Sequence, residues 1–311
     1  MRRIILLHLA LVAVLAAAAF VLPQYHHTNA ARIMVLAVYA MGYNLAFGYT
    51  GLLSLGHAMF FGAGMYGTGL LMQHLGWSAG PAAVAGILAG AGMALVTGLL
   101  ALRTAGVSFM IVTLMFAQAG YLTILYHADL TRGEEGFVLA QGARNLLGLD
   151  LSADMPRYFA ALALFATALG VSLWVVRSRL GQLMVAMREN EERSRMLGHD
   201  PLRIRLAALI LSGGFAGAAG AAYALMFGYV GASFAAIPFS ILPLLWVLTG
   251  GAGTTLGPVL GVAVMFYLVD LASGWTTAHL LVVGVALVVL VLFAPQGILG
   301  TLRERGARWL P

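Results

Sequence analysis

The residues with the greatest capacity for chemistry in this chain lie close together, in residues 185–205. This stretch contains five arginines and four acidic residues, whereas only 9% of the whole chain is charged. Glu189 precedes Arg193 by four residues, and Glu191 precedes Arg195 by the same interval. This is the favourable order for ion pairs on one face of a helix. The pattern therefore predicts a short polar helix that is able to bind a charged or polar partner.

The residues that follow carry the signals of one helix end and the next helix start. Gly198 stands where a glycine commonly ends a helix, while Asp200 and Pro201 are typical of a helix cap and a first helical position. We therefore expect residues 177–205 to form a short helix, a turn and the start of a second helix. Such a segment could be a solvated anchor, a patch for anionic lipid headgroups, or an element that docks on another protein. Its acids favour docking, because they would weaken attraction to anionic lipid.

A second group of polar side chains surrounds a glycine-rich break in an apolar region. These side chains offer hydrogen bonds without net charge, which suits the passage of a zwitterion, and half-helix ends at such a break favour anions. The candidate pathway residues are Asn44, Tyr49, Thr50, Ser54 and His57, with Thr113 and Gln118 from a later apolar segment. The alternative is that the glycines here only let helices pack closely. They are Gly48, Gly51, Gly56, Gly62 and Gly64.

The chain lacks residues that several kinds of enzyme chemistry require. It contains no lysine, and therefore has neither the lysine of a nucleotide-binding P-loop nor an amine for a Schiff base. It contains no cysteine, which excludes disulfides and thiolate metal sites. His57 and the pair His26-His27 have no evident carboxylate partner, so we expect no metal, no cofactor and no enzymatic activity. Active transport by this chain would need energy from a partner or from an ion gradient.

Composition places these residues in an apolar scaffold. The chain is 61% hydrophobic with a mean hydropathy of +0.94, far from a soluble protein with about one quarter of its residues charged. A bilayer core about 30 Å thick is crossed by roughly 20 apolar helical residues. We predict an all-α polytopic membrane protein, one transmembrane domain over residues 1–311, with about ten spans (eight to ten), some of them broken at glycine-rich segments. The spans are expected near 4–22, 31–48, 53–72, 79–102, 106–126, 158–176, 206–228, 237–250, 257–273 and 279–294.

Arginine placement predicts the orientation, because short cytoplasmic loops collect positive charge. Ten spans with the N-terminus inside place Arg103 and residues 177–205 in the cytoplasm, together with the arginines of both termini. The longest loop on the other side, residues 127–157, has five acids and three arginines. The first apolar run exceeds the roughly 7–15 residues of a signal-peptide core, so we expect it to be retained. Both termini are then cytoplasmic.

A weak internal similarity hints at a repeat. The sequence FGYTG at 47–51 follows the second predicted span, and FGYVG at 227–231 follows the seventh. Repeats separated by an odd number of spans are inverted, an arrangement that many transporters use to build a central site. An inverted repeat is therefore possible, and coincidence in a glycine-rich and aromatic composition is the alternative.

Several stretches resemble the permease subunits of branched-chain amino acid ABC importers. AMRENEERSRMLG at 186–198, with the basic residues after it, is similar to the family's cytoplasmic coupling loop. NLAFGYTGLLSLGHAMFFGAGMYGTG at 44–69 resembles its N-terminal signature, and LTGGAGTTLGPVLG at 248–261 its late glycine-rich segment. FAPQGILG at 293–300 resembles its C-terminal ending. VSFMIVTLMFAQ at 107–118 is typical of the longer of the two permease types that pair in these importers.

The resemblance implies a permease that moves hydrophobic amino acids across the bacterial inner membrane by alternating access. Its partners would be a second permease of similar fold, two ATPase subunits, a periplasmic binding protein and the lipid bilayer, with no nucleic acid. The residues expected to transmit ATPase closure to the helices are Arg188, Glu189, Asn190, Glu191, Arg193, Leu197 and Gly198.

The outer loop departs from the family pattern. Leu130-Thr-Arg-Gly-Glu-Glu-Gly-Phe137 resembles a segment of the form L-T-G-G-x-D-G-L, with Arg132 in place of a glycine, Phe137 in place of a leucine, and two adjacent acids in place of one. Ser194 replaces a usual alanine in the coupling loop. The residues expected to contact the binding protein are Asp129, Arg132, Glu134 and Glu135.

Other functions stay open at this point. An ion-coupled secondary transporter would need an acid within the membrane, and Asp270 is the one acid inside a predicted span. It lies near the end of that span, which favours contact with the interface over proton relay. Related permeases carry urea, short amides or other amino acids. A passive channel is disfavoured because nothing resembles a selectivity filter.

Overall fold

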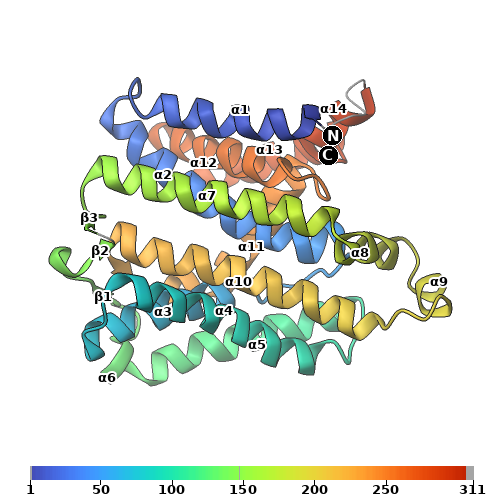
Figure 1. The fold of residues 1–311 in the computed structure, drawn as a ribbon, viewed down its shortest axis with the longest axis horizontal. Helices are drawn as coiled ribbons and strands as arrows, with labels where there is room; N and C mark the ends of the chain where they lie inside the picture. The colour runs from blue at the N-terminus through green and yellow to red at the C-terminus, as the bar shows by residue number, and fades with distance from the viewer. Residues whose placement is uncertain (1, 147, 306–311) are drawn as a thin grey trace.

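The computed structural model describes residues 2–146 and 148–305, and helices dominate it (Figure 1). Within the described residues, ten helices contain at least 14 residues each. They are α1 (Arg2–Ala18), α2 (Gln24–Asn44), α3 (His57–Leu75), α4 (Ala79–Ala101), α5 (Val107–Tyr126), α7 (Asp154–Arg177), α10 (Pro201–Phe227), α11 (Ile237–Gly250), α12 (Gly257–Trp275) and α13 (His279–Phe293). Each one overlaps one of the ten apolar segments predicted from the sequence.

Six of the described helices are long and apolar enough to cross a bilayer by length and composition. These are Gln24–Tyr49, Ala79–Ala101, Val107–Tyr126, Asp154–Arg177, Pro201–Phe227 and Gly257–Trp275. The chain is accordingly an all-α polytopic membrane protein. The other long helices, α1, α3, α11 and α13, are shorter or less apolar, so the number of ten crossings stays a prediction.

Short elements gather at the two ends of the helical bundle. One end, which we call the α8/α9 end, holds α8 (Arg179–Glu189), α9 (Glu191–Met196) and α14 (Gly297–Arg305), and α1 also begins there (Figure 1). The opposite end, the strand end, holds α6, β1, β2 and β3 (Figure 1). Its elements are α6 (Ala128–Thr131), β1 (Phe137–Val138), a 3-10 turn (Gln141–Ala143), β2 (Asn145–Leu146), β3 (Leu149–Asp150), β4 (Tyr229–Val230) and a 3-10 turn (Ala232–Ala235).

Two strand pairs fasten the loops at the strand end. β1 pairs antiparallel with β4, with Phe137 opposite Val230, and thereby joins the 127–153 loop to the segment that follows α10. β2 pairs antiparallel with β3 within the loop itself. The long loop is therefore tied to the helix bundle through short ladders.

Both predicted glycine-rich breaks are present. α2 continues into a π-helical turn over Leu45–Tyr49, and no further helix begins until His57. The second break separates the end of α11 at Gly250 from the start of α12 at Gly257. Gly51 and Gly253, with φ of 76° in each case, supply the left-handed backbone that these breaks need. The third helix therefore begins four residues later than the span predicted from 53.

Close glycine contacts hold α3, α4 and α10 together. A Cβ placed on Gly64 would lie 2.2 Å from the carbonyl oxygen of Gly217, and one on Gly90 would lie 2.6 Å from the Gly217 Cα. No side chain fits in such a space, so the helix backbones approach as small residues in membrane helices allow. At Gly64 the packing interpretation of the glycine pattern is confirmed.

The two similar FGY segments lie at opposite ends of the bundle. Residues 47–51 include the end of the π-helical turn beside the α8/α9 end, whereas residues 227–231 include β4 at the strand end. Opposite ends agree with an inverted arrangement, but the two backbones differ. The inverted repeat stays a prediction.

Candidate functional site

The two glycine-rich breaks meet through the side chain of Asn44. Its Nδ2 donates to the carbonyl oxygen of Thr254 at 2.8 Å, and the backbone N–H of Gly253 donates to its Oδ1 at 2.9 Å. Gly48 lies against the same place, since a Cβ there would be 2.5 Å from the Gly253 nitrogen. We call residues 48–56 and 250–256 together the glycine junction. One buried amide side chain thus pairs backbone groups of the second break.

Neighbouring polar groups stabilise the first break from within. The Thr50 hydroxyl donates to the Leu45 carbonyl at 2.8 Å, and the Ser54 hydroxyl accepts from the Gly56 N–H at 3.2 Å. Thr113 on α5 accepts from the N–H of Leu55 at 3.1 Å. These bonds stabilise the chain between the π-helical turn and the start of α3. Polar groups inside a membrane protein need such partners.

His57, the first residue of α3, is fully buried and belongs to the same region. Its Nε2 lies 2.7 Å from the Ser212 hydroxyl on α10, and its ring meets Tyr43 edge-on at 4.6 Å. No group of three metal-ligating side chains exists among the described residues. His57 therefore joins α3 to α10 through a polar contact and to α2 through a ring contact.

The predicted pathway residues are therefore not spread evenly. Six of them pack at the junction or beside it, and each is buried: Asn44, Tyr49, Thr50, Ser54, His57 and Thr113. Gln118 is half-buried farther along α5. The hydrogen bonds of this set hold the chain's own breaks in place, and its role in lining a pathway stays a prediction.

Arg188, near the end of α8, reaches the glycine junction. Its guanidinium donates to the carbonyl oxygen of Gly48. Its Cγ lies 3.3 Å from the position of a Cβ on Gly51, and its Nη1 lies 3.0 Å from that position on Gly253. A single side chain of the polar surface segment therefore contacts both breaks.

The polar segment itself folds largely as its sequence predicts. α8 and α9 are followed by Gly198 with φ of 87°, and Asp200 then caps α10 by accepting from the N–H of Leu202 at 2.9 Å. Glu191 forms the predicted ion pair with Arg195 at 3.0 Å. It also pairs with Arg205 on α10 at 2.5 Å.

The other predicted ion pair is wrong. The helix is interrupted at Asn190, whose φ of −158° and ψ of 103° are extended. The Asn190 side chain accepts from the N–H of Arg193 at 2.8 Å and begins α9. Glu189 and Arg193 therefore belong to different helices, and the i, i+4 spacing no longer brings them together.

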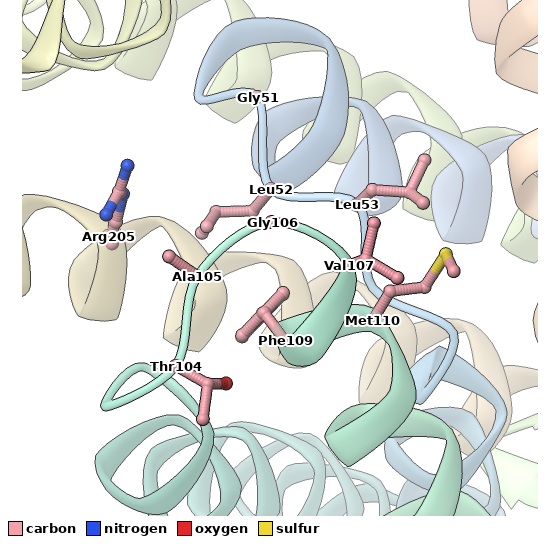
Figure 2. A pocket seen from close by; sticks show the side chains of 10 residues that line it. All are labelled: Gly51, Leu52, Leu53, Thr104, Ala105, Gly106, Val107, Phe109, Met110 and Arg205. Carbon is pink, nitrogen blue, oxygen red and sulfur yellow. The ribbon is translucent and has the colours of Figure 1, made fainter.

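The tip of the segment is open and partly apolar. Met196 and Leu197 are 83% and 72% exposed, and the nearby Arg195 and Asp200 in the sequence are exposed as well. Nearby, a cavity of about 260 Å³ lies between the first break and the α4–α5 connection, with Arg205 at its edge (Figure 2). Leu52, Phe109 and Met110 line its apolar side. Arg205 thus connects the ion pair of Glu191 to the surroundings of the first break.

Comparison with known proteins shows the family of this chain. Residues 27–294 match the family model described as the permease component of branched-chain amino acid transport systems. The chain belongs to this family.

Three relatives carry related names. The high-affinity branched-chain amino acid transport system permease protein LivM of Escherichia coli K12 is 29% identical over 299 residues, covering 88% of this chain and 69% of the relative. Its counterpart in Salmonella typhimurium LT2 is 28% identical over 324 residues, covering 96% and 75%. A probable LivM of Methanocaldococcus jannaschii is 29% identical over 89 residues, covering 28% and 26%. No solved structure matches the chain.

The strand end of this permease presents the predicted binding-protein contacts on its surface. Asp129, Arg132, Glu134 and Glu135 are all exposed. Glu134 accepts from the Tyr121 hydroxyl at 3.0 Å. Arg132 has φ of 59° and is the only described residue other than glycine with positive φ. The backbone at Arg132 thus needs the conformation that glycine adopts most easily, which is physically why related sequences would carry a glycine there.

Asp270, on which an ion-coupled mechanism would depend, lies near the C-terminal end of α12. The Tyr25 hydroxyl donates to its two carboxylate oxygens at 3.0 and 2.8 Å. Tyr25 belongs to the first turn of α2, next to the exposed start of that helix. This position agrees with contact at the membrane interface.

The sequence did not single out three arginines that the structure brings together at the strand end. Arg32 on α2, Arg144 in the loop and Arg157 on α7 all lie around the end of α10. Burial lowers the pKa of Arg144, while the Asp150 carboxylate opposes that shift and the charge of Arg157 adds to it. The available sequence signal was Arg32, a charge inside an otherwise apolar helix.

Proposed function

We propose that this chain is a permease subunit of an ATP-driven importer of branched-chain amino acids in the bacterial inner membrane. A second permease would complete the pathway, two ATPase subunits would bind the α8/α9 end, and a periplasmic protein would deliver substrate to the strand end. The family membership and the names of the relatives support the substrate class and the type of complex. No bond is made or broken in this chain, and its ten long helices change arrangement to pass the substrate.

The observation that carries the proposal is the contact of Arg188 with the glycine junction. α8 lies at the surface, while Gly48 and Gly253 belong to breaks between membrane helices. Because the Arg188 guanidinium donates to the Gly48 carbonyl, a displacement of α8 acts directly on both breaks. A permease that is moved by separate ATPase subunits requires such a mechanical link.

The surface of the segment supports docking on an ATPase. Glu189 and Arg193 are exposed, and the apolar side chains of Met196 and Leu197 project beside them. Exposed apolar side chains with charged residues close by in the sequence fit a cleft on a protein, since a few anchors buried at the centre of an interface carry most of the binding energy and its rim is polar. Glu191, with its pairs to Arg195 and Arg205, instead fixes α9 against α10. Asn190 and Gly198 shape the turns at the two ends of α9.

The orientation of the chain in the membrane follows from the proposed docking of the ATPases at the α8/α9 end. α1 begins at the α8/α9 end and α14 lies there, so the first and the last described helices share the side on which the ATPases would bind (Figure 1). That side is then cytoplasmic. The exposed residues Asp129, Arg132, Glu134 and Glu135 face the periplasm, where they would meet the binding protein.

The proposal is tested in proteoliposomes that contain both permeases, the ATPases and the binding protein. We expect uptake of leucine, isoleucine and valine, dependent on ATP, and no uptake of urea or short amides. Replacing Arg193 and Leu197 together by alanine should lower uptake and the recovery of ATPase subunits with the permease.

The matched control is Arg203→Ala. Arg203 is also exposed and, within the described part of the chain, forms an ion pair only with Asp200, at 3.1 Å, so its loss should leave uptake unchanged. Uptake that persists without ATPase subunits, or uptake of urea in place of amino acids, would overturn the proposal.

A further inference from the structure

Three guanidinium groups converge at the end of α10 on the strand side. The Arg32 guanidinium carbon lies 5.1 Å from the centroid of the Phe227 ring, and that of Arg157 lies 5.8 Å from the same ring. The Arg144 Nη1 lies 2.7 Å from the position of a Cβ on the next residue, Gly228. The three side chains come from α2, from the outer loop and from α7, so the fold brings them together from separate parts of the chain.

The cluster carries more positive than negative charge. Arg157 pairs with Asp154 and also donates to the Thr28 hydroxyl at 3.0 Å. Arg32 and Arg144 belong to none of the ion pairs that the described residues form. The exposed Asp150 carboxylate offsets part of the charge of Arg144, and the C-terminal end of α10 adds only about half a negative charge. A net positive charge is left at this place.

The cluster also has more hydrogen-bond donors than acceptors. The Nε atoms of Arg32, Arg144 and Arg157 are covered by protein and find no acceptor among the described residues. The side-chain nitrogen of Asn29, one turn before Arg32 on α2, is in the same state. Arg144 is only 7% exposed. Buried donors without acceptors are costly, so this arrangement fits an anion small enough to enter it.

An aromatic surface adjoins the cluster. Two of the guanidinium groups lie over the Phe227 ring. The centroid of this ring lies 4.6 Å from that of Tyr223. Tyr223 in turn lies 4.8 Å from Phe234 and 6.0 Å from Phe61, by ring centroids. The positive charge and the apolar surface are therefore contiguous.

We propose that Arg32, with Arg144 and Arg157, binds the carboxylate of an amino acid at the outer end of the permease. The apolar side chain of the amino acid would rest on Phe227 and Tyr223. A guanidinium offers two parallel donors to a carboxylate, which adds geometry to the charge. This inference rests on the proposed function, because only there is the strand end the side from which substrate arrives.

The burial of the cluster selects a small ligand over an acidic side chain of a docked protein. The Arg144 residue is 7% exposed and the Arg157 side chain 13%, and the Nε atoms of Arg32, Arg144 and Arg157 are all covered. The acidic side chains of a docked protein reach exposed arginines more readily than these covered ones. The carboxylate of a free amino acid is small and does not have to approach as part of a protein surface.

The test uses the purified importer complex without its binding protein and measures binding of radiolabelled leucine. Competitors are unlabelled leucine, 4-methylpentanoate, which lacks the ammonium group, and leucinamide, which lacks the carboxylate. Leucine and 4-methylpentanoate should compete, and leucinamide should be about tenfold weaker or worse. Arg32→Gln should weaken leucine binding by about tenfold or more, and Arg32→Lys by less, because it keeps the charge without the fork.

The matched control is Arg103→Gln. Arg103 is an exposed arginine next to the end of α4, far from this cluster, and its replacement should leave leucine binding unchanged. If Arg32→Gln does not assemble into the complex, Arg144→Gln carries the same expectation. Assembly is checked by size-exclusion chromatography of every variant.

Three results would overturn the inference. Arg32→Gln could bind leucine as the wild type does, or leucinamide could compete as well as leucine. Alternatively, Arg32→Gln could weaken only the association with the binding protein, which would assign the cluster to protein docking. If the unmodified complex imports no branched-chain amino acid with ATP, the proposed function itself fails. Normal import combined with unchanged leucine binding by Arg32→Gln removes only this inference.

Discussion

Replacing Asn44 by alanine should separate the two glycine-rich breaks. The side chain makes one donated and one accepted hydrogen bond to the second break, at 2.8 and 2.9 Å, and it is 2% exposed. Alanine removes both bonds and leaves the N–H of Gly253 and the carbonyl of Thr254 without this partner. Neither residue belongs to a helix. The lost bonds therefore have no helical replacement.

Two typical energies serve to judge the loss of stability expected for Asn44→Ala. Hydrogen bonds between membrane helices average about 0.6 kcal/mol in double-mutant cycles, because the unfolded chain finds other partners in the membrane. A buried backbone group left unpaired costs about 1–3 kcal/mol. The unpaired-group value applies here, since the partners are non-helical backbone groups. We therefore expect Asn44→Ala to lower the free energy of unfolding by about 2–4 kcal/mol.

The measurement is the thermal unfolding midpoint of the purified importer complex in detergent, followed through the folded fraction of this chain. The matched control is Asn145→Ala in β2, an exposed asparagine whose side chain donates to the Gly142 carbonyl at 3.1 Å. Its loss should change the free energy by less than about 0.5 kcal/mol, as is usual for surface positions. Asn44→Ala should also lower the uptake achieved per ATP hydrolysed, because the end of α2 would then no longer be bonded to the second break when α8 moves.

A small effect would refute this reasoning. If Asn44→Ala destabilised the protein no more than Asn145→Ala, the two bonds would not hold the breaks together. Unchanged coupling of hydrolysis to uptake, in a variant that is clearly destabilised, would leave the junction as a structural element and remove it from the transmission of force.

Three further changes test other parts of the structure. Arg132→Gly should raise the free energy of unfolding by about 1 kcal/mol, because it relieves a positive φ, and denaturation of the purified chain measures this. Gly64→Ala should destabilise by about 1–3 kcal/mol through its contact with Gly217, while Gly92→Ala on open helix surface should be neutral or slightly stabilising, as thermal midpoints would show. Glu191→Ala should reduce ATP-dependent uptake a few-fold, because Arg205 loses its 2.5 Å partner and the pair is partly covered. Equal effects of Gly64→Ala and Gly92→Ala on the thermal midpoint would contradict the packing argument. No gain in stability for Arg132→Gly would contradict the argument from its positive φ.

The sequence alone was sufficient to predict features that depend on residues close together in the chain. Apolar length placed all ten long helices, since burial in lipid demands continuous apolar residues. Gly198, Asp200 and Pro201 marked the end of one helix and the start of the next through their backbone preferences alone. The breaks were visible as glycine-rich runs. In each case the decisive interaction joins residues a few positions apart.

Features that depend on distant residues could not be read in this way. Asn44 and Thr254 are 210 positions apart, and Arg188 lies 140 positions from Gly48. A polar residue near glycines is compatible with a pathway lining or with a structural clamp, and only the fold shows which groups meet. The Glu189–Arg193 pair failed for a local reason, because Asn190 competes for the backbone and starts a new helix.

The two kinds of contact at the core of the bundle differ in how they would respond to force. α3 and α10 touch backbone to backbone at Gly64 and Gly217, where no side chain can rearrange to absorb a shift. The glycine junction joins its two breaks through the side chains of Asn44 and Arg188, across backbone that lies outside the α-helices. Side-chain hydrogen bonds can follow a displacement by changing rotamer or partner, whereas a close glycine contact can only separate. Movement of α8 should therefore reach α2 and α12 through the junction while α3 and α10 remain together, which makes the junction the place where coupling is lost first.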